Sequence, residues 1–267
     1  MLLANWRLIR ELLSSVDVAL EVVDIRDPLT TRSRRFESLC NELGAKYVIV
    51  LNKVDLVPRN VVQAWIKYFE EIESVRAVPV SAQKRIGTLR LRKIVRRLDN
   101  KKPLIIGVFG IPKVGKSTLI NTWVGRHATR TSPYPGTPGY TKKAQLFNAG
   151  SGIYLLDTPG IIPVEEDKVE VTIRMNPVDT ISNPVAIAVG LIKKIMTYNS
   201  RAFVEAYRIN SSDPDSILRE LALRRGWIYK SDKEPVITES AKLIIRDYLD
   251  GKIKFYVLPP RTPSELK

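Results

Sequence analysis

Cysteine, long apolar runs and acidic residues are all scarce in this 267-residue chain. A single cysteine, Cys40, cannot form an internal disulfide, so a reducing cytoplasm is the expected compartment. The apolar run at 185–192 (VAIAVGLI) is far too short to span a bilayer. The first residues also lack the long apolar core and cleavage site of an export signal. Neither export nor membrane insertion is therefore expected.

The shortage of acidic residues leaves a large positive charge, because 28 Asp and Glu face 43 Lys and Arg, for a net charge of +15. Protein affinity for nucleic acid depends on neutralising phosphates and releasing counterions, so this balance favours an RNA partner. The excess is densest in Lys84, Arg85, Arg90, Arg92, Lys93, Arg96, Arg97, Lys101 and Lys102. Apolar residues between them predict a helix over 89–98. Its basic face is either an RNA contact, which we favour, or an ordinary solvated surface.

Residues 110–117 (GIPKVGKS) match the phosphate-binding pattern G-x-x-x-x-G-K-[ST] in full. An apolar run at 103–109 precedes them and a helix-like segment at 118–124 follows, which is the strand, loop and helix that this motif requires. Backbone N–H groups of such a loop surround the β-phosphate, Lys116 brings a cation to the β and γ oxygens, and Ser117 ligates magnesium. The nucleotide contacts predicted here are Gly110, Pro112, Lys113, Val114, Gly115, Lys116, Ser117 and Thr118.

A second phosphate-side motif, D-T-P-G, occupies 157–160 and follows a short apolar run at 153–156. Asp157 is expected to hold magnesium through a water molecule, and the Gly160 N–H to reach the γ-phosphate. D-T-P-G is also a common turn sequence, so it indicates phosphate binding only together with the other nucleotide motifs.

The tetrapeptide Asn52-Lys53-Val54-Asp55 follows a β-rich run at 46–51 and predicts recognition of guanine. The Asp55 carboxylate can accept hydrogen bonds from both N1 and the N2 amine of guanine, whereas adenine offers no such pair of donors. Asn52 is expected to tie this loop to the phosphate loop, and Lys53 to lie along the base plane.

Ser81 and Ala82 are the remaining residues predicted to recognise guanine, since the Ala82 N–H is expected to donate to guanine O6. N-K-x-D alone is a weak pattern. Together with the phosphate loop, D-T-P-G and Ser81-Ala82, it predicts GTP and GDP as ligands, bound with Mg²⁺.

The guanine motif lies before the phosphate loop, which reverses the order of an ordinary GTPase. Candidate strands are expected at 16–24, 46–51, 77–80, 104–109, 144–147 and 153–156, with helices at 32–43, 61–71 and 89–98. This alternation predicts an α/β fold with a doubly wound, mostly parallel six-stranded sheet. Circular permutation moves only the termini and keeps every loop at the same sheet edge. Residues 1–165 are thus expected to form a circularly permuted P-loop GTPase domain.

Residues 166–267 are expected to form a small, mainly α-helical domain that contacts RNA or the ribosome. Asp213 and Gly226 bracket one predicted helix, and Thr238 and Gly251 another. Between them lies a basic and aromatic cluster of Arg224, Arg225, Trp227, Tyr229 and Lys230. The cluster either contacts phosphate and a splayed base or packs between the helices.

The motif order, together with D-I-R-D-P at 24–28, resembles the D-A-R-x-P signature of the circularly permuted GTPases of the YlqF/RbgA/YawG family. Residues 251–260 are also similar to the G-K-I-x-x-Y…P-P ending of some archaeal and eukaryotic members. The resemblance implies an assembly factor for the large ribosomal subunit, with that subunit or its rRNA as partner. We expect a monomer that does not bind DNA.

The residue after D-T-P-G is Ile161, where small signalling GTPases have a glutamine that orients the attacking water. An alkyl chain cannot do this, so intrinsic hydrolysis is expected to be slow and to be stimulated by the ribosomal partner. The alternative is a guanine-nucleotide-gated RNA-binding or scaffold module with negligible hydrolysis. The one histidine, His127, either approaches the γ-phosphate or lies exposed in a loop.

The switch threonine that completes the magnesium shell is Thr137 or Thr141, and the family pattern P-G-x-T favours Thr141. Lys113 stands where many relatives have an asparagine that helps to hold a potassium ion. Its ammonium either replaces that ion or points to solvent or RNA. The groups expected to act in hydrolysis are thus Lys116, Thr141, Gly160 and Lys113.

Overall fold

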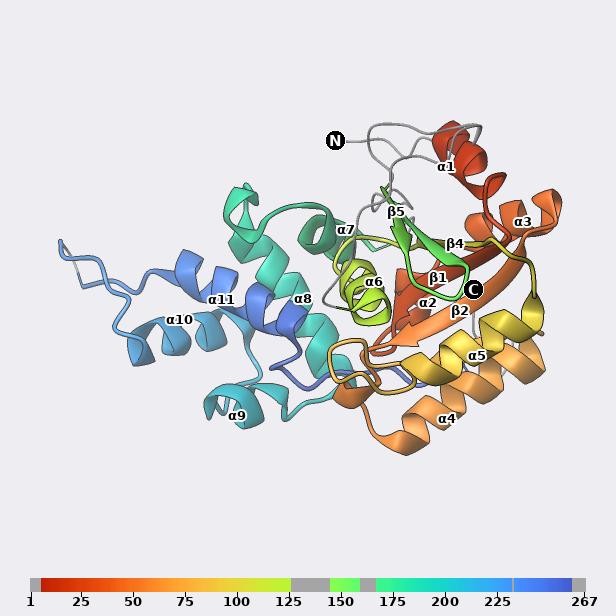
Figure 1. Ribbon diagram of the computed structural model, residues 1–267. Coiled ribbons are helices and arrows are strands. Elements are labelled where there is room, and N and C mark those ends of the chain that lie inside the picture. Colours follow the sequence, from red (N-terminus) through yellow and green to blue (C-terminus); the bar gives the residue numbers. More distant parts are fainter. Residues whose placement is uncertain (1–5, 126–144, 159–166, 232, 261–267) are drawn as a thin grey trace. The chain divides into compact units, whose positions relative to one another are not determined.

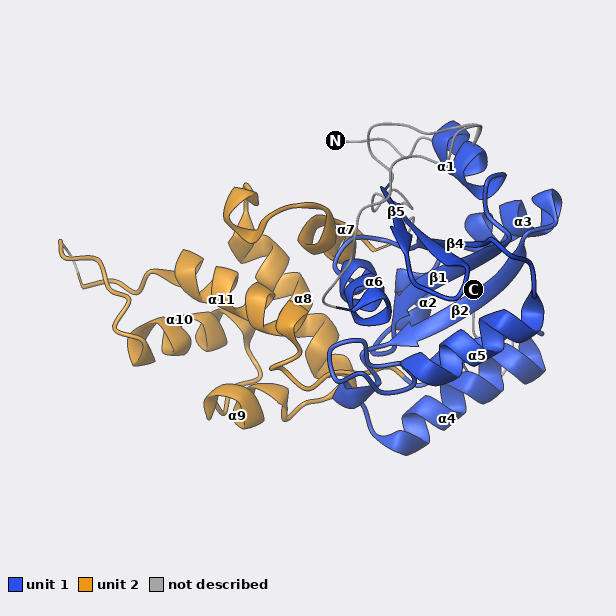
Figure 2. Ribbon diagram, viewed as in Figure 1, with its two compact units in different colours: residues 1–165, 258–267 blue, residues 166–257 orange. Residues whose placement is uncertain are grey.

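The computed structural model describes residues 6–125, 145–158, 167–231 and 233–260 of the chain. The chain divides into two compact units, one of residues 1–165 with 258–267 and one of residues 166–257 (Figure 2). Residues 258–267 group with the first unit rather than with the second domain, which the sequence predicts over 166–267.

The first unit is built on one six-stranded sheet with the order β3-β2-β1-β4-β6-β5 (Figure 1). The strands are β1 (Val18–Asp24), β2 (Lys46–Asn52), β3 (Ala77–Pro79), β4 (Leu104–Phe109), β5 (Gln145–Asn148) and β6 (Ile153–Asp157). All neighbouring pairs are parallel except β5 and β6. The predicted mostly parallel, six-stranded α/β sheet is therefore confirmed, with shifts of one or two residues at several strand ends.

The helices of this unit are α1 (Trp6–Leu13), α2 (Pro28–Thr31), α3 (Arg34–Leu43), α4 (Arg59–Lys67), α5 (Thr88–Leu98) and α6 (Lys116–Val124). The expected helix at 32–43 is shorter than predicted, because the Ser33 hydroxyl caps α3 by accepting from the Phe36 N–H. The expected helix at 61–71 corresponds to α4 and a following short π-helix, Tyr68–Ile72. Helix α1 is not predicted from the sequence.

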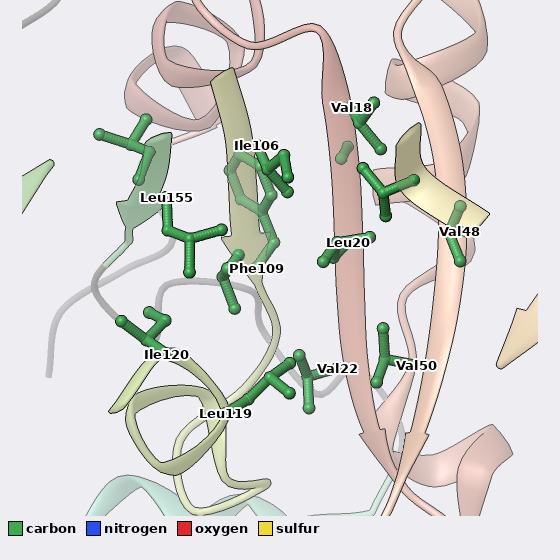
Figure 3. Close-up of a cluster of buried hydrophobic side chains, with 14 of the residues drawn as sticks. Val18, Leu20, Val22, Val48, Val50, Ile106, Phe109, Leu119, Ile120 and Leu155 are labelled. Carbon is green, nitrogen blue, oxygen red and sulfur yellow. The ribbon is translucent and has the colours of Figure 1, made fainter. Parts of the chain in front are cut away.

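The central strand β1 is buried at all seven positions, as a parallel strand covered on both faces should be. Successive side chains alternate between faces, so Val22 and Val23 enter different clusters. Val22 packs in a cluster with Leu119 and Ile120 of α6 (Figure 3), and Val23 in a cluster with Trp65 of α4. Helices cover both faces, which makes the sheet doubly wound.

One acidic side chain interrupts this apolar strand. Glu21 is fully buried, and its carboxylate accepts hydrogen bonds from the Ser33 N–H at 2.7 Å and from the Tyr47 hydroxyl. Burial raises the pKa of Glu21 to about 7, while the Tyr47 hydrogen bond and the nearby Arg32 charge oppose that rise. The ionised form of this carboxyl is therefore stabilised less in the folded protein than in water.

The second unit is helical, with α7 (Lys168–Met175), α8 (Pro184–Tyr198), α9 (Ala202–Tyr207), α10 (Pro214–Arg224) and α11 (Ile237–Asp250). The apolar run 185–192 lies in α8 and packs in the core of this unit, where Leu191 and Ile192 are fully buried. Helix α11 begins at Ile237 rather than after a Thr238 cap, because Val236 is held by its N–H bond to the Trp227 carbonyl. Within the described ranges, no helix combines the length and apolarity that a membrane span needs.

A buried ionic cluster joins three of these helices. Glu170 of α7 accepts from the Arg174 Nε at 2.7 Å, from the Lys194 Nζ at 3.3 Å and from the Tyr248 hydroxyl. The two cations outweigh the effect of burial and lower the pKa of Glu170 to about 2. A buried carboxylate with three donors remains ionised across the neutral range.

Candidate nucleotide-binding site

The predicted nucleotide motifs meet because four parallel strands end at one edge of the sheet. Asp24 at the end of β1 is in register with Asn52 at the end of β2, and Val108 of β4 with Asp157 of β6. Strands β1 and β4 lie side by side in the sheet. From β1 the chain continues to β2 on one side, and from β4 it continues to β5 and β6 on the other. Ligands of open α/β sheets bind at such a switch point, beyond the carboxyl ends of the strands.

The phosphate loop follows β4 and has backbone conformations that require its glycines. Gly110 has φ 137°, and a Cβ on it would lie 2.5 Å from the Val22 carbonyl oxygen. Gly115 has φ 103° and forms the N-cap of α6. Lys113 also has a positive φ of 63°, and its side chain is exposed. The loop therefore presents the N-terminus of α6, where anions bind favourably.

Lys116 lies in the first turn of α6 and is 7% exposed, with its Nζ 2.8 Å from the Ile111 carbonyl oxygen. Burial lowers the pKa of Lys116 to about 8, while the Asp157 carboxylate opposes that change. Burial also raises the pKa of Asp157, and Lys116 opposes that shift in turn. An incoming phosphate would favour the charged form of Lys116, since an opposite charge replaces lost hydration.

Oxygen donors at the same edge fit a magnesium ion that is shared with nucleotide phosphates. Ser117 is exposed beside Lys116, and Asp157 is half-buried at the end of β6. Within the described ranges, no group of three His, Cys, Asp or Glu side chains could hold a metal by itself. Magnesium commonly takes one or two protein oxygens and completes its shell with phosphates and water, which suits this donor set.

Several predicted groups lie outside the described residues. These are Gly160, Ile161, Thr137, Thr141 and His127. Thr158, next to Asp157, is described and donates its hydroxyl to the Val108 carbonyl oxygen at 2.8 Å, which fixes the start of the D-T-P-G segment against β4.

Asn52 connects three loops. Its Nδ2 donates to the Val114 carbonyl oxygen at 2.8 Å, and its Oδ1 accepts from the Ala82 N–H at 3.0 Å. The predicted tie between the guanine motif and the phosphate loop is thus present. The Ala82 N–H, expected to donate to guanine O6, is bonded to Asn52 in this structure. Ser81 lies beside it, and its hydroxyl accepts from the Lys84 N–H at 3.2 Å.

Asp55 lies in a short 3₁₀ turn, Val54–Leu56, directly after the Lys53 backbone. Its side chain is exposed, and within the described residues it makes no hydrogen bond or ion pair. The carboxylate that is predicted to read guanine N1 and N2 is thus available to an incoming base.

The D-I-R-D-P segment also reaches this edge, a contact that the sequence alone did not suggest. The Asp24 carboxylate lies 2.9 Å from the Lys53 Nζ and 2.7 Å from the Arg26 Nη2. The charged residues Asp24 and Arg26 at the end of a mostly apolar strand were the available signal. Their partner on β2 becomes clear only from the register of the two strands.

The basic residues of α5 divide into two groups. Arg92 donates to the Ala149 carbonyl oxygen at 2.7 Å, and Arg96 donates to the Ser151 carbonyl oxygen, so both hold the turn between β5 and β6. Arg90, Lys93 and Arg97 are exposed, and no hydrogen bond or ion pair joins them to the described part of the chain. These three residues, here called the α5 basic face, share one side of the helix.

The cluster between α10 and α11 is also divided. Arg224 pairs with Glu220 at 2.5 Å and donates to the Tyr207 carbonyl oxygen at 2.9 Å, which gives it a structural role. Trp227 is half-buried, whereas Tyr229 is 51% exposed and Lys230 is exposed. The packing interpretation thus suits Arg224. The side chains of Tyr229 and Lys230, in contrast, are exposed to solvent.

The sheet order and the position of the phosphate and guanine loops define a circularly permuted P-loop GTPase fold. Residues 4–167 match the model of the RsgA GTPase family, which is more than half of the chain. The protein therefore belongs to the RsgA GTPase family.

Similarity to individual proteins supports this family assignment. The chain is 30% identical over 254 residues to an uncharacterized GTP-binding protein of Methanocaldococcus jannaschii, covering 94% of this chain and 66% of that protein. It is 31% identical to nucleolar GTP-binding protein 2 of Schizosaccharomyces pombe, covering 95% of this chain and 48% of that protein. It thus spans less than two thirds of the length of either relative.

Among solved structures, GNP-bound YlqF from T. maritima is similar, with a TM-score of 0.64 and 22% identity. The match covers 94% of this chain and 96% of that one. At this identity the likeness concerns the fold, and the circularly permuted order of strands and loops is shared.

Proposed function

We propose that this protein binds GTP and GDP with Mg²⁺, hydrolyses GTP slowly by itself, and acts as an assembly factor on the large ribosomal subunit or its rRNA. The observation that carries the nucleotide part is the pair of hydrogen bonds made by Asn52, one to Val114 of the phosphate loop and one from Ala82, which join three predicted loops at one sheet edge. A strand end with an ordinary polar turn would not need that connection.

Guanine selectivity is assigned to Asp55, whose exposed carboxylate can accept from two adjacent donors on guanine. Contacts to phosphate are assigned to the 110–118 loop, with Lys116 as the cation at the β and γ oxygens. Ser117, Asp157 and Thr141 would hold Mg²⁺, which offsets charge on the phosphates during transfer. Gly160 would bind the γ-phosphate through its N–H.

The ribosomal part of the proposal rests on the family resemblance and on charge. The α5 basic face offers three cations without protein partners among the described residues, so each could neutralise a phosphate. Tyr229 and Lys230 in the second unit supply a second candidate contact, with an exposed ring that a splayed base could stack on. A monomeric state and a cytoplasmic location belong to the same proposal.

The alternative, a guanine-nucleotide-gated RNA-binding module with negligible hydrolysis, is favoured by one feature, Ile161 after D-T-P-G. Turnover of GTP with and without purified large ribosomal subunits separates the two. Stimulation by large subunits, with small subunits as the control, supports an assembly GTPase. Nucleotide-dependent subunit binding without turnover would support the gated module.

A further inference from the structure

The central strand β1 ends between the two halves of the nucleotide site and carries no nucleotide motif of its own. In the order β2-β1-β4, its last residue Asp24 lies between the strand before the guanine loop and the strand before the phosphate loop. Asp24 is in register with Asn52, and the Ile25 N–H donates to the Asn52 carbonyl oxygen at 2.9 Å. The end of β1 is therefore fixed directly beside Lys53.

Asp24 is held rigidly. Arg26 donates to its two carboxylate oxygens, from Nη2 at 2.7 Å and from Nε at 3.0 Å, and the Arg26 N–H adds a third bond at 3.2 Å. Both side chains are 1% exposed. A paired arginine and carboxylate with two parallel bonds has little freedom to rotate.

Lys53 meets this pair from the guanine loop. Its Nζ lies 2.9 Å from the Asp24 Oδ2, and its side chain is 19% exposed. Its backbone is left-handed, with φ 67°, a conformation that glycine or asparagine adopts more readily than lysine. Backbone of this kind costs energy and is found mainly at functional sites.

We propose that Asp24, fixed by Arg26, is a positioning residue for guanine nucleotide binding: it orders the Lys53 side chain so that its aliphatic stem is already aligned with the base plane. This inference rests on the proposed function. An ordered side chain has less freedom to lose when the ligand arrives, which raises affinity. The stem contacts the face of the base rather than its edge, so Asp24 governs affinity and Asp55 governs selectivity.

A double-mutant cycle tests the coupling. Asp24→Asn, Lys53→Met and the double variant are titrated with GDP and with inosine diphosphate, which lacks the N2 amine. Each single variant is expected to bind GDP roughly 3- to 10-fold more weakly. The double variant should bind no more weakly than Lys53→Met alone, because Asp24 acts through Lys53. The preference for GDP over inosine diphosphate should stay constant across the cycle.

Two controls keep the outcome interpretable. Asp24→Asn leaves Arg26 buried without its carboxylate, so Asp24→Asn with Arg26→Met removes both charges and should reproduce the affinity loss at a higher melting temperature. Arg10→Ala breaks an exposed ion pair with Glu42 far from any predicted motif, and should leave GDP binding unchanged. Losses that multiply in the double variant, or an unchanged affinity in Asp24→Asn, would overturn the inference while GDP binding itself stands. Failure of the unmodified protein to bind GDP would instead overturn the proposed function, and this inference with it.

Discussion

The side-chain nitrogen of Asn52 occupies the space where a Cβ of residue 115 would lie: a Cβ built on Gly115 would be 2.3 Å from the Asn52 Nδ2. The asparagine of the guanine loop can therefore approach the phosphate loop only because residue 115 has no side chain. Asn52 and its hydrogen-bond partner Val114 lie 62 residues apart along the chain, yet each of the two motifs limits which residue the other can contain.

Gly115→Ala should reduce GDP affinity by at least about tenfold, because the new methyl group displaces Asn52 and the φ of 103° disfavours alanine. Gly44→Ala is the matched control, since Gly44 also has a positive φ of 68° but a Cβ there would meet nothing within 4 Å. It should lower stability by about 1 kcal/mol and leave GDP binding intact. Calorimetric titration and thermal denaturation of both variants measure this contrast; equal GDP affinities would contradict it.

The unmodified protein should prefer GDP to ADP by roughly 10³-fold or more, since ADP leaves the Asp55 carboxylate without its donor pair. Asp55→Asn should shift the preference toward xanthosine diphosphate, whose C2 carbonyl suits an amide donor. Competition of each diphosphate against a fluorescent GDP analogue gives the ratios. Comparable dissociation constants for GDP and ADP in the unmodified protein would reject guanine recognition.

Replacing Arg90, Lys93 and Arg97 by Glu should weaken binding to ribosomal RNA and flatten its dependence on salt. Each lost phosphate contact lowers the slope of log affinity against log salt by nearly one unit, so a change of about 2 to 3 is expected. GTP affinity should barely change.

The matched control carries the same change in charge on other exposed basic residues of the first unit, namely Arg59, Lys67 and Arg76. If both triple variants lost the same affinity, net charge rather than the α5 basic face would be responsible. An unchanged slope in the α5 variant would leave that face as a solvated surface.

Lys113 should make GTP hydrolysis nearly equal in sodium and in potassium, because its ammonium would stand in for a bound potassium ion. Lys113→Asn should be slower and should now respond to potassium. The variant is expected to fold, since asparagine tolerates the left-handed backbone found here at φ 63°. Rates are compared at matched ionic strength, and strong potassium stimulation of the unmodified protein would show that Lys113 does not replace the ion.

Glu21 should make the protein less stable as the pH rises toward 8. Its pKa is about 7 in the folded protein against 4.5 as its reference value, so the stability linked to its proton is complete below about pH 4.5 and is lost as the pH passes 7. The groups around it are Ser33, Tyr47, Arg32 and Glu37. Urea unfolding of the unmodified protein and of Glu21→Gln should show a difference that changes by roughly 2 to 4 kcal/mol between pH 5 and pH 8.

Glu170→Gln is the control for that measurement. The pKa of Glu170 is lowered to about 2, so its contribution is present above about pH 4.5 and is lost only on stronger acidification. The difference in the free energy of unfolding between Glu170→Gln and the unmodified protein should stay constant between pH 5 and pH 8. If the difference in the free energy of unfolding were also constant with pH for Glu21→Gln, Glu21 would have an ordinary pKa in the folded protein.

The loops were the easiest part of this protein to predict, because a phosphate loop demands a fixed order of Gly, Lys and Ser within eight residues. Helix α1 is not among the predicted helices, although Ile9, Leu12 and Leu13 have the spacing of a buried helical face. The start of α11 was misplaced because a contact between Val236 and Trp227, rather than a capping side chain, sets it.

The contact between Asp24 and Lys53 depends on the register between two strands, and no local pattern specifies it. The sequence pattern does predict a strand at this position. It cannot show which neighbour its last residue will meet, since that follows from the packing of the whole sheet.

The strand order also determines how the sheet can grow during synthesis. Strand β1 lies at the centre and is made before its neighbours; β2 and β3 then extend one side, and β4, β6 and β5 extend the other. A chain emerging from the ribosome can therefore complete the three-stranded guanine half before the phosphate half exists. Strand β4 then adds to the free edge of β1, whereas β5 must wait for β6, which lies between it and β4. In an unpermuted GTPase, whose phosphate loop comes first, the two halves would be translated in the opposite sequence.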